Sequence, residues 1–254
     1  MSGTYSKGTR EASEGRLTMK SFNCLLVGES GVGKTPLCAT LEDCEHTSPC
    51  LFLDVDRGTM SIIAEPRPIV WEVTSWGQMQ QVYTFVKNEQ WDKLGELVGA
   101  EPREYKSIVV DSGTELEYIL RKTIMSEDST GSDVPEQRHY LKTQERFRSL
   151  YRAYRDLPLT LVMTAGVRDL KDDVASIIKY FPSFQPALTR DLVRMTDLIM
   201  FMDVRQDQEK KGWQRVLQTH PSGRIIARDR SQRLAPLITG EKLYFKDIIV
   251  KMGA

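Results

Sequence analysis

The chain has 254 residues, of which 40% are hydrophobic and 28% are charged, a balance that suits one sizeable α/β domain better than two complete domains. Lysine plus arginine number 35, as do aspartate plus glutamate, so the zero net charge excludes a global attraction to nucleic acid and leaves local basic patches for such binding. No apolar run is long enough to cross a bilayer, and residues 1–20 lack the apolar segment of a signal peptide. We therefore expect a cytoplasmic protein without membrane association.

The first half of the chain alternates strands with helices after a polar leader. Residues 1–20 carry Gly, Ser, Thr, Lys and Glu without apolar periodicity, which predicts a disordered tail, followed by one domain over residues 21–254. Short apolar or β-branched runs predict strands, and helical spacing of apolar residues predicts helices. The expected strands are 23–27, 50–54, 68–74 and 107–111, and the expected helices are 37–41, 78–87 and 115–125.

The second half of the chain ends in a β-rich segment. The expected elements are a mobile loop at 126–136, a helix at 140–156, a strand at 160–164, an irregular stretch at 166–185, a helix at 188–195, and antiparallel strands at 198–204, 213–218 and 224–228. Trp71 and Trp213 are expected in the core. Strands that alternate with helices before a β-rich end predict an α/β fold, with a mainly parallel central sheet flanked by helices and a C-terminal antiparallel β extension.

The most specific motif is the sequence GESGVGKT, which fits the phosphate-binding pattern G-x-x-x-x-G-K-[ST] in full and lies between a predicted strand and a predicted helix. Its residues are Gly28, Glu29, Ser30, Gly31, Val32, Gly33, Lys34 and Thr35. In such a loop the glycines let backbone N–H groups face the phosphates, and the helix N-terminus adds partial positive charge. We expect Lys34 to reach the β- and γ-phosphates of ATP, and the Thr35 hydroxyl to bind Mg²⁺.

Acidic residues at strand ends supply the remaining chemistry. Asp111, which ends the run SIVVD, is the expected second Mg²⁺ ligand, in the position of a Walker B carboxylate. Ser112 follows it, so the Asp-Glu pair found in many ATPases is absent. Asp56, after the neighbouring strand, is the best substitute for activating the attacking water, and Glu72 and Glu115 are the alternatives. Each of these three acids also fits a solvated surface position or a helix cap.

Two further groups of residues have competing interpretations. Cys38, Cys44 and Cys50 lie near His46, but their spacing matches none of the paired-cysteine zinc patterns, which favours buried reduced thiols. Four arginines gather in the segment GRIIARDRSQR, where they suit either a phosphate clamp or a solvated strand edge paired with Asp229. These arginines are Arg224, Arg228, Arg230 and Arg233.

The order of motifs resembles a known family. GESGVGKT is followed by FLDVDRG, SIVVDSGTEL, LVMTAGVRD and, near the end, IIARDR. This order is similar to that of the RecA-fold P-loop ATPases and, among them, of the Sak-type phage recombination and annealing ATPases (the phage nucleotide-binding AAA-like family). The resemblance covers roughly residues 21–235, and the P-loop is its specific part.

The resemblance implies roles for residues that the motifs alone leave open. The water-activating acid would be Asp56, and the polar residue that couples the γ-phosphate to the DNA-binding loop would fall at Thr164 or Ala165, although alanine has no side-chain hydrogen bond to offer. Packing is the alternative role of Thr164. The basic residues near the end would be Arg228 and Arg230, which we expect to act on the nucleotide of a neighbouring subunit. The loops 126–136 and 166–185 would face DNA.

The resemblance further implies an ATP-hydrolysing, Mg²⁺-dependent protein that forms a homo-oligomer with shared nucleotide sites. It would act on single-stranded DNA in phage-type recombination or annealing, with an annealing or single-strand-binding protein as partner, in the cytoplasm of a bacterial host. Two alternatives stay open. One is a P-loop ATPase that serves as an assembly or structural switch without DNA, and the other is a nucleotide-binding partner protein that no longer hydrolyses ATP.

Overall fold

The computed structural model describes residues 12–13, 16–17, 21–62, 68–128, 134–172, 177–206 and 212–253. Within the leader, the described residues form two short antiparallel strands, β1 (Ala12–Ser13) and β2 (Arg16–Leu17). The disorder expected for the rest of the leader lies outside the described residues.

One nine-stranded sheet forms the centre of the molecule. Its order is β13 (Leu237–Gly240), β11 (Trp213–Gln218), β10 (Leu198–Gln206), β3 (Asn23–Gly28), β7 (Thr160–Ala165), β6 (Ser107–Asp111), β4 (Cys50–Asp54) and β5 (Ile69–Glu72), with β12 (Arg228–Asp229) paired to β10. Neighbours from β10 to β5 are parallel, and the pairs β10–β11, β11–β13 and β10–β12 are antiparallel. The expected fold class, a mainly parallel sheet with a C-terminal antiparallel extension, is confirmed.

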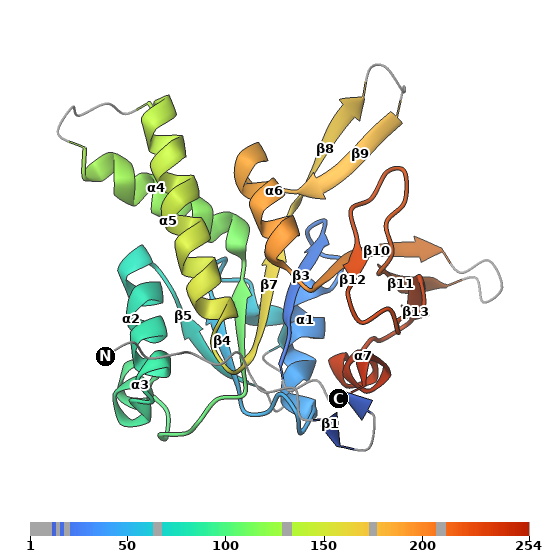
Figure 1. Cartoon of the computed structure of the whole chain (residues 1–254), viewed down its shortest axis with the longest axis horizontal. Helices are drawn as coiled ribbons and strands as arrows, with labels where there is room; N and C mark the ends of the chain where they lie inside the picture. The colour runs from blue at the N-terminus through green and yellow to red at the C-terminus, as the bar shows by residue number, and fades with distance from the viewer. Residues whose placement is uncertain are drawn as a thin grey trace.

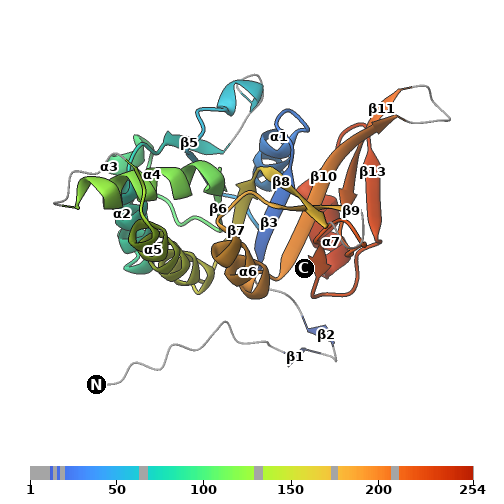
Figure 2. The same cartoon turned by 90° about the horizontal axis from the view of Figure 1, so that it is seen from above.

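Helices cover both faces of this sheet (Figure 2). On one face lie α2 (Trp76–Lys87), α3 (Trp91–Val98), α4 (Gly113–Ser126), α5 (Gln137–Arg155) and α6 (Pro186–Met195). On the other lie α1 (Lys34–Ala39), the 3₁₀ segments η1 (Thr40–Asp43) and η2 (Thr59–Ile62), and α7 (Phe245–Met252). Because side chains alternate along a strand, Leu25 and Val27 of β3 pack on the α2–α6 side, whereas Cys24 and Leu26 pack on the α1–α7 side. Among the described residues, no helix combines the length and apolar character that crossing a membrane requires.

The segment 166–185, expected to be irregular, instead contains a β-hairpin. Strands β8 (Val167–Asp172) and β9 (Ile177–Pro182) pair antiparallel and project beyond the carboxyl end of β7 (Figure 1). Leu170 and Ile178 on this hairpin are exposed. Since the hairpin has no buried face of its own at these positions, its sequence lacks the apolar alternation that identifies a half-buried strand.

The C-terminal part differs from expectation in three further respects. The expected strand 224–228 is reduced to the two residues of β12, because Arg228 and Asp229 alone pair with β10. The expected antiparallel strand 198–204 is β10, which is antiparallel to β11 but parallel to β3, so it belongs to the main sheet. Trp213, expected in the core, is 70% exposed at the start of β11, while Trp71 packs against the core.

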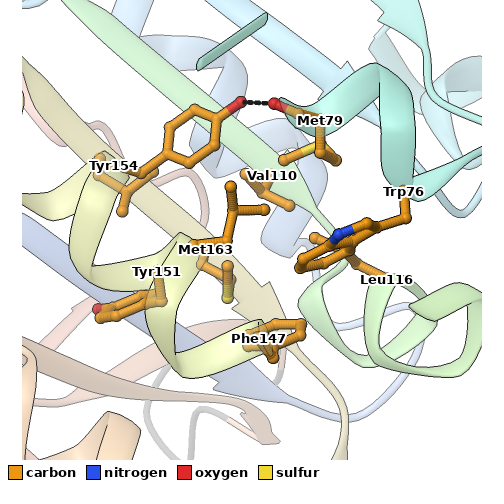
Figure 3. Close-up of a pocket in the computed structure, with 10 residues that line it drawn as sticks. Trp76, Met79, Val110, Leu116, Phe147, Tyr151, Tyr154 and Met163 are labelled. Carbon is orange, nitrogen blue, oxygen red and sulfur yellow. Dashed lines mark hydrogen bonds between the residues drawn. The ribbon is translucent and has the colours of Figure 1, made fainter. Parts of the chain in front are cut away.

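The helical layer on the α2–α6 side encloses a small apolar cavity of about 10 Å³ (Figure 3). Trp76, Met79, Phe147 and Met163 are among the side chains that surround it, and the Tyr154 hydroxyl beside it donates a hydrogen bond to the Met79 carbonyl at 2.7 Å. A space of this size holds one water molecule at most. The cavity is therefore a packing feature of the core and not a ligand site.

Candidate functional site

The phosphate-binding loop lies where β3 meets α1, at the carboxyl edge of the parallel strands. Gly31 and Gly33 have φ values of 80° and 108°, in the left-handed region that favours glycine. A Cβ on Gly28 would lie 2.6 Å from the Met202 carbonyl oxygen of β10. The loop therefore requires glycine both for its backbone turn and for its close packing against the neighbouring strand.

Lys34 lies over the loop with two acidic side chains nearby. Its Nζ donates hydrogen bonds to the carbonyls of Gly28 and Glu29, both at 2.8 Å. Burial lowers the pKa of Lys34, and the negative charges of Asp111 and Asp56 act in the opposite direction. The fold thus gathers the loop lysine and both of the expected catalytic carboxylates in one place.

The carboxylate of Asp111 is held between two threonine hydroxyls. Thr35 Oγ1 donates to Asp111 Oδ2 at 2.6 Å, and Thr164 Oγ1 donates a short hydrogen bond to Asp111 Oδ1. Burial raises the pKa of Asp111, while these two hydrogen bonds lower it. A hydroxyl and a carboxylate at one point beside the loop are oxygen ligands of the kind that Mg²⁺ takes. Thr35 and Asp111, which are 76 positions apart in the chain, therefore fit the expected metal ligands.

Asp56 is the acid that the fold places beside Asp111. The backbone N–H groups of Val55 and Asp56 donate to the Asp111 carbonyl at 2.6 and 3.1 Å, which ties the end of β4 to the end of β6. The Ser112 hydroxyl donates to Asp56 Oδ1 at 3.0 Å and accepts the N–H of Glu115 at 3.3 Å. Ser112 therefore caps α4 and orients Asp56 at the same time.

The two alternative acids are placed differently. Glu72 forms an exposed ion pair with Arg57 at 2.6 Å. Glu115 lies in the first turn of α4 and lines a separate pocket on that helix. Of the three acids, only Asp56 has a described contact between its carboxylate and Ser112, the residue that follows Asp111, whereas Glu115 meets Ser112 through its backbone N–H. Its role in activating water stays a prediction.

Arg228 and Arg230 are not brought to the phosphate-binding loop of their own chain. Arg228 pairs with Ile199 near the start of β10, and its Nη1 donates to the Val193 carbonyl at 2.7 Å. Arg230 donates to the Arg194 carbonyl at 2.8 Å and pairs with Asp197 at 2.7 Å. Both guanidinium groups thus cap the C-terminal turn of α6, where helix carbonyls lack partners. The finger that acts on a neighbouring subunit stays a prediction.

The structure gives roles near the loop to two residues for which the sequence predicts none. The sequence-based expectation for Ser112 is only that it replaces a glutamate, although a serine followed three residues later by Glu115 is an N-cap signal. Arg215 of β11 donates through Nε to the Val32 carbonyl at 3.3 Å and through Nη1 to the Glu241 carbonyl at 2.5 Å. No sequence signal points to Arg215, because its contact spans 183 positions.

The cysteines near His46 are buried thiols. Cys38, Cys44 and Cys50 are free and buried, and burial raises the pKa of Cys50 to about 12. Within the described ranges, no three His, Cys, Asp or Glu side chains gather as metal ligands.

The AAA domain profile matches residues 20–231, a span that includes the phosphate-binding loop, Asp56, Asp111 and Thr164. The chain belongs to the AAA domain family. Its phosphate-binding loop and its mainly parallel sheet are those of an AAA-type nucleotide-binding ATPase fold. A comparison with curated protein sequences finds no match.

Among solved structures, this AAA domain is similar to two archaeal proteins. One is a KaiC-like protein of Pyrococcus horikoshii OT3, with 12% identity and a TM-score of 0.40 over 78% of this chain and 77% of that one. The other is the flagellar accessory protein FlaH of Methanocaldococcus jannaschii, with 10% identity and a TM-score of 0.46 over 86% of this chain and 84% of that one.

Proposed function

We propose that this AAA domain binds ATP with Mg²⁺ at residues 28–35 and hydrolyses it. The observation that carries the proposal is the placement of the Asp111 carboxylate between the hydroxyls of Thr35 and Thr164, directly beside the phosphate-binding loop. Thr35 and Asp111 would hold the metal, which when bound would neutralise charge on the phosphates. Lys34 would exchange its carbonyl partners for phosphate oxygens.

Asp56 is the general base in this proposal. Its carboxylate would accept a proton from the attacking water. The hydrogen bond from the Ser112 hydroxyl to Oδ1 would hold the carboxylate in one orientation. Thr164 would report the state of the site to the hairpin that follows it. Ala165 has no side-chain donor, but the Gly166 N–H donates to the Thr114 hydroxyl at 3.1 Å, which offers a second connection between α4 and the base of the hairpin.

We further propose that ATP turnover serves an action on single-stranded DNA, in recombination or annealing of the phage type. Support comes from a pocket of about 370 Å³ where α4 meets the segment after β9. Arg121 lies 5.7 Å from the ring centre of Tyr118 and 5.5 Å from that of Tyr140, and both rings are partly exposed. Exposed aromatic rings beside an arginine suit the stacking of unpaired bases.

The remaining parts of the proposal concern assembly. The protein would form a homo-oligomer in which Arg228 or Arg230 of one subunit serves the nucleotide of the next, and an annealing or single-strand-binding protein would be its partner. For the arginines to act in this way, the caps on α6 would have to open or leave guanidinium nitrogens for the neighbour.

The experiment is the ATPase rate with and without single-stranded DNA, together with a size measurement in each condition. We expect turnover to rise with single-stranded but not with double-stranded DNA. Tyr118→Ala should weaken binding of single-stranded DNA by about five- to 150-fold, which corresponds to the loss of one base stack. The matched control is Tyr244→Ala, which removes a similar ring beside a cation (Lys242 at 5.2 Å) on the opposite side of the sheet.

Each outcome assigns a function. Turnover that DNA does not change, with a size that depends on nucleotide, would replace the DNA proposal with an assembly switch. Nucleotide binding without any turnover would leave a binding protein that has lost hydrolysis. Equal effects of Tyr118→Ala and Tyr244→Ala on binding of single-stranded DNA would contradict a DNA-binding role of the α4 pocket.

A further inference from the structure

We propose that Arg215 is a positioning residue that sets the orientation of the Val32–Gly33 peptide in the phosphate-binding loop and thereby the affinity for nucleotide. The inference rests on the proposed binding of ATP at residues 28–35. It gives the C-terminal β extension a part in the nucleotide site, which neither the loop motif nor the family match assigns to it.

The argument starts from the geometry of one peptide unit. Arg215 Nε donates to the Val32 carbonyl at 3.3 Å. In a trans peptide the carbonyl and the following N–H point in opposite directions, so a guanidinium that holds the Val32 carbonyl turns the Gly33 N–H away from β11. Backbone N–H groups of this loop are the donors that cradle phosphates. Arg215 therefore fixes the direction of one of those donors before nucleotide arrives.

The position of the guanidinium is itself well determined. Arg215 pairs with Val204 of β10 on one side and with Gly240 of β13 on the other. Its Nη1 donates to the Glu241 carbonyl at 2.5 Å, directly after β13. The side chain thus bridges the loop and the turn after the edge strand. Backbone pairing fixes its base, and the two hydrogen bonds fix its guanidinium group.

Close packing explains why the loop accepts this arginine. A Cβ on Gly33 would lie 2.6 Å from Arg215 Nε and 3.3 Å from Met202 Cε. Gly33 is therefore glycine for two reasons, its left-handed φ of 108° and the proximity of Arg215. The positive charge of Arg215 beside the loop would also attract the phosphates of a bound nucleotide.

Binding and turnover should respond differently to the loss of Arg215. The Gly33 N–H contributes to binding in the ground state and in the transition state alike, so its misorientation should raise Kd and KM more than it lowers kcat. Because hydrogen bonds from charged groups are among the stronger ones, we expect Arg215→Ala to weaken nucleotide binding about tenfold, with kcat within about twofold of the wild type. Arg215→Lys keeps the charge and one donor direction, so its nucleotide affinity should fall between those of the wild type and Arg215→Ala.

The experiment compares Arg215→Ala, Arg215→Lys and a control, Arg205→Ala, in the full chain. Arg205 lies on the adjacent strand β10 and pairs with Asp203 at 3.1 Å. The probe is a fluorescent ATP analogue with Mg²⁺, followed by steady-state kinetics and by hydrogen exchange of the peptide that contains Gly33. We expect weaker binding and faster exchange for Arg215→Ala, partial recovery for Arg215→Lys, and wild-type behaviour for Arg205→Ala.

The outcomes separate this inference from the function on which it rests. A wild-type protein that binds no ATP analogue would overturn the proposed function and the role of Arg215 with it. Wild-type binding together with unchanged affinity in Arg215→Ala would overturn the role of Arg215 alone, as would a loss of kcat at unchanged KM. If Arg215→Ala does not fold, Arg215→Lys decides, since wild-type affinity and wild-type exchange in that variant would contradict a directional hydrogen bond to Val32.

Discussion

Replacing Ser112 with alanine removes two hydrogen bonds that serve different purposes. The hydroxyl accepts the Glu115 N–H at 3.3 Å, which caps α4, and donates to Asp56 Oδ1 at 3.0 Å, which orients the proposed general base. The first contact affects the stability of the fold, and the second affects turnover. The substitution therefore has two measurable effects with separate physical causes.

Both effects can be estimated. Loss of an N-cap costs about 1 kcal/mol, which for a chain of this size lowers Tm by roughly 2–4 °C. A hydrogen bond to an ionised carboxylate contributes about 1.5–3 kcal/mol, so a misoriented Asp56 should lower kcat by roughly 10- to 100-fold. The loss cannot exceed that of removing the base itself, about 10²- to 10⁴-fold.

The matched control is Ser75→Ala. Ser75 caps α2 and accepts the Gln78 N–H at 3.3 Å, the same distance as in the Ser112 cap, but it lies on an exposed helix end without contact to Asp56. Thermal melting should show similar losses for the two variants, and steady-state ATPase assays should show a loss of kcat for Ser112→Ala alone. Equal kcat values in the two variants would refute the view that Ser112 orients the base.

Three further predictions concern other parts of the molecule. Asp56→Asn should lower kcat by about 10²- to 10⁴-fold and leave binding of an ATP analogue intact; a larger loss in Glu115→Gln or Glu72→Gln would move the base there. Burial raises the pKa of Glu117, so protonation of its carboxyl favours the folded state: this stabilisation is present below the ordinary pKa of glutamate and is lost as pH rises through the raised value. Glu117→Gln should therefore raise Tm at neutral pH, with the gain shrinking in melts at acidic pH, and a gain that does not change with pH would contradict this cause. Arg228→Ala should lower Tm because it opens the cap on α6, and an unchanged Tm would contradict the capping role. If the variant also loses turnover, and mixing it with excess Lys34→Ala protein restores activity, Arg228 serves a neighbouring subunit as well.

Buried elements could be predicted from the sequence, and the reason is physical. Strands β4 and β6 are buried on both faces, so their runs CLFLD and SIVVD are continuous, and the predicted and observed bounds agree. The β8–β9 hairpin could not be identified in this way, because exposed positions such as Leu170 leave no apolar alternation to find. Local sequence signals report burial, and an element without a buried face gives a weak signal.

The residues of the site likewise fall into those that the sequence predicts and those that it does not. The loop at residues 28–35 and Asp111 follow from motifs, because each needs only its own strand and the turn after it. Ser112 and Arg215 act through partners that the fold supplies, namely Asp56 from the segment after β4 and the Val32 carbonyl 183 positions away. Arg228 shows the converse. The basic cluster in the sequence predicts a phosphate clamp, which stays a prediction, and the contact that the structure describes for Arg228 is with the end of α6.

The measurement that tests the central claim most directly is Mg²⁺-dependent ATP hydrolysis by the wild-type protein and by Lys34→Ala, with binding of an ATP analogue measured in parallel. Lys34 is the point charge expected to face the β- and γ-phosphates, and its side chain already lies over the loop on the carbonyls of Gly28 and Glu29. The account predicts turnover by the wild type that requires Mg²⁺, and loss of most of the affinity or turnover in Lys34→Ala. Normal hydrolysis by Lys34→Ala, or a wild type that neither binds nor hydrolyses ATP, would contradict it.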